Sequence, residues 1–252
     1  MSGDWLAARV IGHRGAAAHA PENTIAGLAR AAALGVAMVE VDAKLSRDGI
    51  PVLFHDDRLD RTTNGKGPVA QADHETLSRL DAGSWFGPAF AGEPIPTLAA
   101  AIAEMTRLKL ALNLEIKPCP GRERETAEIA LAVAQAHWPA DRPPPLVSSF
   151  AVECLEVAQV AAPDWPRGLL LERATPGWDR LAQRLDAASV NIAAGMASAV
   201  AIAGYRRGGR RCLAYTVNDA MEAESLLAMG MDAVISDCPD LILARLAGRR
   251  PA

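Results

Sequence analysis

Ionisable side chains follow three short apolar runs of the sequence, at the points where these runs end. The set consists of His13 and Arg14, Glu40 and Asp42, and Glu115 and Lys117. In a strand that is covered on both faces, such side chains are costly to bury unless they are paired, bind a metal or face an active-site opening. Burying all of them without purpose would cost several kcal/mol. We therefore expect them to face one shared site.

The spacing of the carboxylates predicts a metal site. Residues two apart on a strand point to the same side, so Glu40 and Asp42 should project together, as should Glu115 and Lys117. Three carboxylates from neighbouring strands would repel one another unless a cation lay among them. Hard oxygen ligands without cysteine favour Mg²⁺ or Ca²⁺ over zinc, and Mn²⁺ is compatible with the same set. Glu40, Asp42 and Glu115 are thus expected to bind one divalent cation.

A hairpin delivers a second histidine to this cluster. Asp48-Gly49 is a strong two-residue turn signal, and a turn centred there would place Asp42 opposite His55. His13 approaches from the end of the first strand. Two histidines beside a metal and two cationic side chains form an acid/base pair suited to a phosphodiester.

Structural explanations compete with each of these assignments. A single buried histidine is more often a core residue than a catalyst, and Glu115 with Lys117 could be a structural ion pair. Their combination at one opening favours catalysis. We assign no catalytic role to His19, His74 or His137. The aromatic residues Trp85, Phe86 and Phe90 are interpreted as the core of a cap.

The elements that must position these residues alternate along the chain. Short β-rich apolar runs alternate with helical segments, as in an α/β protein with parallel strands. The expected strands are Arg9 to His13, Ala37 to Leu45, Leu110 to Lys117, Leu146 to Ser149, Gly168 to Glu172, Ser189 to Ile192, Arg211 to Val217 and Ala233 to Ser236. The expected helices are Thr24 to Leu34, Leu98 to Arg107, Arg122 to Ala136, Ala151 to Ala161, Trp178 to Leu185, Ala197 to Arg207, Ala220 to Met229 and Pro239 to Leu246. Eight such units predict a TIM (βα)8 barrel, with the ionisable residues at its catalytic face.

One segment interrupts the alternation. Residues from about Asp56 to Pro96 carry dense turn signals and no long helical period. We expect a small cap inserted after the hairpin of the second strand, enclosing the alcohol portion of a substrate. The chain 1–252 is then one barrel domain.

Composition excludes several classes of protein. With 26 basic and 30 acidic residues the formal charge is -4, which offers no general attraction to nucleic acid. Met1 to Val10 lacks the apolar core of a secretory signal, so we expect the mature chain to begin at its own N-terminus. Ile192 to Ala203 is too short to span a membrane. The four cysteines, Cys119, Cys154, Cys212 and Cys238, are scattered and are expected to be free thiols in a reducing compartment.

These motifs together resemble the glycerophosphodiester phosphodiesterase family. They are Gly12-His13-Arg14-Gly15, Pro21-Glu22-Asn23-Thr24, Glu40-x-Asp42, Asp48-Gly49 followed by His55-Asp56, Glu115-Ile116-Lys117 and Thr216-Val217-Asn218. The insertion also matches, through Arg61-Thr62-Thr63-Asn64-Gly65 and Asp81-Ala82-Gly83-Ser84-Trp85. Ser148-Ser149-Phe150 and Arg167-Gly168-Leu169-Leu170-Leu171 are most similar to the cytosolic bacterial branch linked to glycerol-3-phosphate uptake.

The resemblance implies roles for individual residues and a cytoplasmic location. His13 and His55 would be the acid/base pair, Glu40, Asp42 and Glu115 the metal ligands, and Arg14 and Lys117 the phosphate-binding residues. Tyr215 stands where many members carry tryptophan, which alters how glycerol would stack. Asn191 stands where the cytosolic branch often has histidine, which removes a donor at the rim. The implied reaction hydrolyses glycerophosphocholine or glycerophosphoethanolamine to glycerol 3-phosphate and an alcohol.

Three alternatives stay open at the level of sequence. Lys117 could form a Schiff base in an aldolase, although three nearby carboxylates would hold it protonated. A non-catalytic phosphodiester-binding barrel and a phospholipase-like enzyme acting on lysolipids are the others. The sequence leaves open the headgroup, the metal, the oligomeric state, the nucleophile (water or the substrate 2-hydroxyl) and which histidine is the acid.

Overall fold

The computed structural model describes residues 5–248 of the chain. Residues 1–4 and 249–252 lie outside this range. Both ends of the domain expected at 1–252, and the first four residues of the segment from Met1 to Val10, are therefore outside the described residues.

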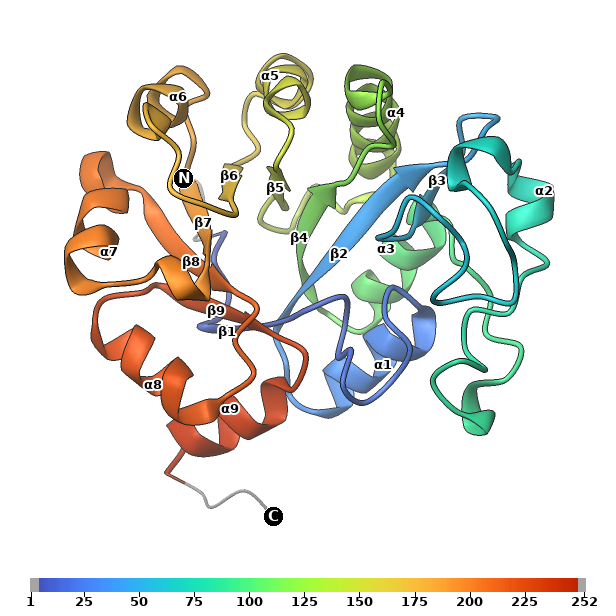
Figure 1. Cartoon of the computed structure of the whole chain (residues 1–252), viewed down its shortest axis with the longest axis horizontal. Helices are drawn as coiled ribbons and strands as arrows, with labels where there is room; N and C mark the ends of the chain where they lie inside the picture. The colour runs from blue at the N-terminus through green and yellow to red at the C-terminus, as the bar shows by residue number, and fades with distance from the viewer. Residues whose placement is uncertain (1–4, 249–252) are drawn as a thin grey trace.

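Within the described range, eight parallel strands close into a barrel (Figure 1). Their order is β1-β2-β4-β5-β6-β7-β8-β9, and β1 closes the ring because it pairs with both β2 and β9. The short β3 is added to β2 as an antiparallel strand. The strands are β1 Val10–Gly12, β2 Met38–Leu45, β3 Pro51–Leu53, β4 Ala111–Ile116, β5 Leu146–Ser149, β6 Arg167–Leu171, β7 Ser189–Ala193, β8 Arg211–Tyr215 and β9 Ala233–Ser236.

Helices on the outside of the barrel connect successive strands, and α9 follows the last strand. They are α1 Ile25–Ala33, α3 Leu98–Arg107, α4 Glu123–His137, α5 Val152–Ala161, α6 Trp178–Arg184, α7 Ala199–Tyr205, α8 Ala220–Ala228 and α9 Pro239–Leu246. Side chains at several N-termini accept hydrogen bonds from the first turn, for example Thr24 from the Gly27 amide. Every strand and helix expected from the sequence is present, with ends within two residues of the prediction. The predicted TIM barrel is confirmed.

Alternation along β2 explains how one strand serves both the core and the site. Val39, Val41 and Ala43 belong to the apolar cluster shared with α3 and α4. Met38 belongs to a different cluster with Ile11, which lies on the next strand of the barrel. Glu40 and Asp42 share the inward face with Met38, because residues two apart on a strand point to the same side. The inward face is therefore apolar at Met38 and acidic toward the carboxyl end.

The hairpin register differs by one residue from the prediction. Ala43 pairs with Leu53, and the Phe54 amide donates to the Asp42 carbonyl at 3.0 Å, so Asp42 faces Phe54 rather than His55. The turn has three residues instead of two, because the Ser46 amide donates to the Ile50 carbonyl at 3.0 Å. Gly49 supplies the left-handed conformation, with φ 82°, that such a turn requires. His55 lies beyond the end of β3, so strand pairing does not fix its direction.

The segment between β3 and α3 contains short helices: η1 Val69–Gln71, α2 His74–Leu77 and η2 Pro88–Phe90. Its buried core is mainly aliphatic and includes Leu59, Val69, Leu77 and Ile95. The aromatic core expected for this cap is wrong. The three aromatic rings pack edge to face on one another at the surface, where Trp85 is 40% exposed.

A buried ion pair ties this segment to the barrel. The Lys44 side chain in β2 is only 1% exposed, and its Nζ donates to Asp57 Oδ1 at 2.7 Å. Asp57 itself is 57% exposed, so the pair reaches from the interior to the surface. Without Asp57 this ammonium group would lack its ion-pair partner.

No helix among residues 5–248 is long and apolar enough to cross a membrane. The four cysteines are free, and three of them, Cys119, Cys154 and Cys212, are buried.

Candidate active site

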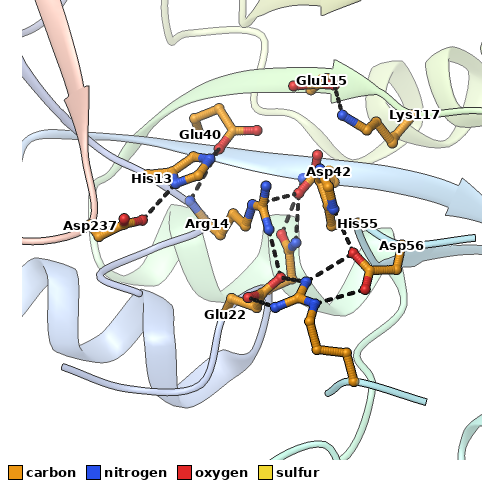
Figure 2. A network of polar contacts seen from close by, with 12 residues as sticks. His13, Arg14, Glu22, Glu40, Asp42, His55, Asp56, Glu115, Lys117 and Asp237 are labelled. Carbon is orange, nitrogen blue, oxygen red and sulfur yellow. Dashed lines mark hydrogen bonds and ion pairs between the residues drawn. The ribbon is translucent and has the colours of Figure 1, made fainter. Parts of the chain in front are cut away.

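The ionisable residues converge at the carboxyl ends of neighbouring strands (Figure 2). His13 and Arg14 follow β1, Glu40 and Asp42 lie in β2, and Glu115 lies in β4. Parallel pairing sets Asp42 directly beside Glu115. The carboxyl ends of barrel strands form the face where barrel enzymes carry their chemistry.

Glu40, Asp42 and Glu115 form a carboxylate triad. Each offers one oxygen, and these oxygens lie within 4.8 Å of one another. All three side chains are buried, and Glu40 Oε1 has no hydrogen-bond partner among residues 5–248. The two-residue spacing read from the sequence therefore produces the expected convergence.

The electrostatics of the triad favour the addition of positive charge, because three buried carboxylates lie close together. Burial, followed by the charges of Asp42 and Glu115, raises the pKa of Glu40 well above its usual value. Burial and Asp42 raise the pKa of Glu115 to about 7. Burial also acts to raise the pKa of Asp42, but Arg14 and other nearby cations outweigh it and lower this pKa. A buried, unpartnered carboxylate oxygen in an all-oxygen donor set fits a hard divalent cation.

His13 is held between the triad and the last strand. Its Nε2 lies 3.9 Å from Glu40 Oε2, and its Nδ1 lies 2.6 Å from Asp237 Oδ1. Asp237 also accepts a hydrogen bond from Asn218 Nδ2 at 2.7 Å. Although burial opposes it, the bond with His13 lowers the pKa of Asp237. The carboxylate at Nδ1 leaves Nε2 free to face the site.

His55 has an equivalent arrangement on the other side of the site. Its Nδ1 lies 2.7 Å from Asp56 Oδ1. Burial lowers the pKa of His55, and the charges of Arg14 and Lys117 act in the same direction, against that of Asp42. His55 is thus near enough to the triad to feel its charge, although the predicted strand pairing is absent.

Arg14 contacts the triad through its backbone and its side chain. Its amide donates to Glu40 Oε2 at 3.1 Å, and its Nε lies 3.3 Å from Asp42 Oδ2. The side chain donates through Nη1 to Glu22 Oε1 at 2.7 Å. Glu22 and Asp42 therefore fix the direction of the guanidinium group.

Lys117 lies at the rim of the same opening. Its Nζ donates to Glu115 Oε1 at 2.8 Å and lies 4.9 Å from the centre of the Phe150 ring. Burial lowers the pKa of Lys117, but Glu115 and Asp42 outweigh it and raise the value. The amine is therefore held as an ammonium group.

Tyr215 and Asn191 differ in their distance from the rim. Tyr215 ends β8, and its ring packs edge to face on Phe150 with the ring centres 5.8 Å apart. Its hydroxyl is buried and has no hydrogen-bond partner in the described part of the chain. Asn191 is fully buried inside β7 and accepts a hydrogen bond from Ser189 Oγ at 2.8 Å. The rim position expected for residue 191 is therefore wrong.

Several polar residues of the site were not predicted from the sequence. Asn23 binds Asp42 twice, through Nδ2 to Oδ2 at 2.8 Å and by accepting from the Asp42 amide at 3.1 Å. Glu22, Arg61 and Asp56 connect Arg14 to His55 through a series of ion pairs. We call this series the ion-pair chain; it comprises Arg14, Glu22, Arg61, Asp56 and His55.

A signal for some of these residues was present in the sequence. Asp237 directly follows the strand ending at Ser236, which is the same pattern that identified Glu115 and Lys117. Glu22 and Asn23 lie in Pro21-Glu22-Asn23-Thr24, a motif that indicates the family but gives neither residue a role. Arg61 lies in an irregular loop, where no periodicity indicates which side chains turn inward.

Comparisons with known proteins agree with this geometry. The model of the Glycerophosphoryl diester phosphodiesterase family matches residues 13–241. A putative glycerophosphodiester phosphodiesterase, YhdW of Bacillus subtilis, is 35% identical over 240 residues, covering 93% of this chain and 96% of that protein. A glycerophosphodiester phosphodiesterase of Caldanaerobacter subterraneus is 32% identical over 238 residues, covering 93% and 96%.

A solved structure is similar over nearly its whole length. A phosphodiesterase of Oleispira antarctica, in complex with the product sn-glycerol-3-phosphate, superposes with a TM-score of 0.92 and 40% sequence identity. The match covers 95% of this chain and 97% of that one.

Proposed function

The chain belongs to the glycerophosphoryl diester phosphodiesterase family, and from this premise we propose how its site cleaves a glycerophosphodiester. The enzyme hydrolyses such diesters to glycerol 3-phosphate and an alcohol. The product bound to the Oleispira relative supports glycerol 3-phosphate as the product here. The observation that carries the proposal is the carboxylate triad flanked by two histidines, each bonded through Nδ1 to a carboxylate.

Glycerophosphocholine and glycerophosphoethanolamine are the proposed substrates. Glu40, Asp42 and Glu115 would hold one divalent cation, proposed to be Mg²⁺ or Ca²⁺, with Mn²⁺ as a further candidate. When bound, the cation supplies positive charge that stabilises the phosphate as negative charge grows on its oxygens.

Arg14 and Lys117 are proposed to bind the phosphate. Both are cations fixed by neighbouring carboxylates, Arg14 by Glu22 and Lys117 by Glu115. Preorganised charges of this kind stabilise a transition state without reorganising during the reaction. Tyr215 is proposed to contact the glycerol portion of the substrate. Its ring packs on Phe150, and the Phe150 ring also contacts the ammonium group of Lys117 at the rim.

His13 and His55 are proposed as the acid/base pair. The carboxylate at each Nδ1 leaves Nε2 available to exchange a proton with the substrate. One histidine takes a proton from the nucleophile, and the other donates a proton to the leaving alcohol.

Two alternatives are weakened by the geometry. The raised pKa of Lys117 argues against a Schiff-base aldolase, because that reaction needs an unprotonated amine. A non-catalytic binding barrel has no need of two histidines oriented by carboxylates beside a triad. A phospholipase-like activity on lysolipids uses the same chemistry, and a substrate screen separates the two. A cytoplasmic location, the link to glycerol-3-phosphate uptake and the treatment of 1–252 as one domain stay predictions.

The test is a screen of several glycerophosphodiesters with Mg²⁺, Mn²⁺ and Ca²⁺, each repeated with excess chelator. We expect added metal to raise activity and to stabilise the fold, by about 2.7 kcal/mol at a hundred times the dissociation constant. Asp42→Asn should lose both responses, whereas Glu125→Gln, an exposed change on α4, should keep them. Full activity and unchanged thermal stability in excess chelator would remove the metal from the mechanism.

A further inference from the structure

Arg61 is the central cation of the ion-pair chain and comes from the segment between β3 and α3. Its guanidinium group binds Asp56 through Nε to Oδ2 at 2.7 Å and Nη2 to Oδ1 at 2.9 Å. It binds Glu22 through Nη1 to Oε2 and Nη2 to Oε1, both at 2.7 Å. One side chain thus makes forked contacts to two carboxylates.

Each of these carboxylates has a second partner in the site. Asp56 Oδ1 is bonded to His55, and Glu22 Oε1 accepts from Arg14 (Figure 2). Arg61 is therefore one residue removed from a proposed acid/base group on one side and from a proposed phosphate-binding group on the other.

We propose that Arg61 is a positioning residue that aligns His55 with Arg14 by holding Asp56 and Glu22 through forked hydrogen bonds. This inference rests on the roles proposed above for His55 and Arg14. The inserted segment thereby contributes a residue to the geometry of the reaction.

Exposure favours a positioning role over a purely stabilising one. The Arg61 side chain is 45% exposed, and exposed ion pairs contribute little to folding stability. The geometry nevertheless uses four of the five guanidinium N–H groups, all at short distances. Such forked contacts fix direction, and they do so in a way that a lysine could not reproduce.

Electrostatics agree with this assignment. Bonding to Arg61 lowers the pKa of Asp56 despite its partial burial. Burial acts to raise the pKa of Glu22, but Arg61 and Arg14 together outweigh it and lower the value. Both groups are therefore held as carboxylates that can accept hydrogen bonds from His55 and Arg14.

The chain offers a matched control in Arg58. It lies three residues earlier in the same segment and forms an exposed ion pair with Asp60, at 3.2 Å. Among residues 5–248, no hydrogen bond or ion pair joins Arg58 to His55, Asp56 or Glu22. Arg58→Met therefore removes an arginine from the insertion without touching the ion-pair chain.

The experiment compares Arg61→Met, Arg61→Lys and Arg58→Met in the full, metal-loaded enzyme. With Arg61→Met we expect kcat to fall about 10- to 100-fold, the scale seen when a partner that orients a functional histidine is lost. KM should rise less, and Arg61→Lys should recover little. In Arg61→Ala, which leaves room for the missing side chain, millimolar ethylguanidinium should restore part of the lost rate, which it would not do for a variant that is merely unfolded. Arg58→Met should keep the wild-type kcat.

A double-mutant cycle locates the effect. If Arg61 acts through Asp56, adding Arg61→Met to Asp56→Asn should lower kcat much less than it does in the wild type. Equal effects in both backgrounds, or a wild-type kcat for Arg61→Met, would overturn the proposal.

Nitrogen-15 NMR of the His55 ring gives a readout that does not depend on turnover. We expect one tautomer, protonated at Nδ1, in the wild type and a mixture in Arg61→Met. An unchanged spectrum of His55 in the variant would contradict the positioning role even if no substrate were found. Lack of turnover by the wild type would instead overturn the proposed function, so the two failures are distinguishable.

Discussion

Two acidic regions lie in the same barrel opening, and their carboxylates behave in opposite ways. In the carboxylate triad, Glu40 has an unpartnered oxygen, and the pKa values of Glu40 and Glu115 are raised. In the ion-pair chain, Glu22 and Asp56 bind arginine through both oxygens, and their pKa values are lowered.

The difference separates a binding site from its scaffold. Carboxylates that repel one another are arranged for a ligand that is to be added, here a cation. Carboxylates whose charges are already matched have no need of a further ion and instead hold neighbouring groups in place. Acidic residues at a barrel mouth should therefore be sorted by their partners before any of them is named a metal ligand.

The largest expected effect concerns the two histidines: His13 lies beside the carboxylate triad, and His55 belongs to the ion-pair chain. We expect His13→Ala and His55→Ala each to lower kcat on glycerophosphocholine by about 10² to 10⁴, the usual scale for a positioned acid or base. Metal binding should stay nearly intact, because neither residue belongs to the triad. Steady-state kinetics with a parallel metal titration checks both points.

The leaving group distinguishes the two histidines. A nitrophenyl phosphodiester needs little help from a general acid, so the histidine that protonates the alcohol should become largely dispensable with it. The other histidine should remain necessary. Near-normal kcat for both alanine variants would show that neither imidazole transfers a proton during the reaction. Loss of metal binding in either variant would show that the histidine helps to bind the cation.

A smaller effect concerns the free energy of unfolding, which we expect to change in opposite directions when a carboxylate is neutralised in each of the two regions. In metal-free protein at pH 8, Glu40→Gln removes one of three repelling charges, so we expect the free energy of unfolding to rise by about 1 kcal/mol. Asp56→Asn removes a charge that is matched by Arg61, so we expect a loss of about 1 kcal/mol. Denaturant unfolding of both variants measures these free energies. A change in the same direction for both variants would contradict the distinction between the triad and the ion-pair chain.

The triad should also give the metal-free protein a pH-dependent stability. The folded-state pKa of Glu115 is raised to about 7, so folded protein binds a proton more tightly than unfolded protein does. Stability should therefore increase as pH falls from about 8 toward 5, by at most about 1.4 kcal/mol per pH unit. Saturating Mg²⁺ should remove this gain, because the proton and the cation compete for the triad. Urea denaturation at a series of pH values, with and without metal, checks it; a metal-free curve that is flat or that falls would count against the raised pKa.

The fold was predictable because hydrophobic alternation and the barrel's burial pattern agree. In β2, the order Met38-Val39-Glu40-Val41-Asp42-Ala43 places apolar residues outward at every second position and reserves the inward positions near the carboxyl end for acids. The same rule predicted the convergence of the carboxylate triad.

The sequence does not predict the direction of side chains that lie in turns and loops, because the two-residue alternation of a strand ends there. The hairpin register was wrong by one residue because a three-residue turn with Gly49 resembles a two-residue turn in sequence. His55 still reaches the site because it lies in a loop. Asp237 obeyed the strand-end rule but was not considered, whereas Arg61 has no sequence signal of direction at all.

The buried Lys44 has a consequence for how this protein can have changed over evolution and for how it can be engineered. Its ammonium group is in the interior of the second barrel unit, and its partner Asp57 comes from the inserted segment. A change that removed Asp57 while Lys44 stayed buried would leave an ammonium group in the interior without its counter-ion, which is destabilising. Redesigning this loop without Asp57 therefore calls for a prior or simultaneous change of Lys44 to an apolar residue, so the order of the two mutations matters.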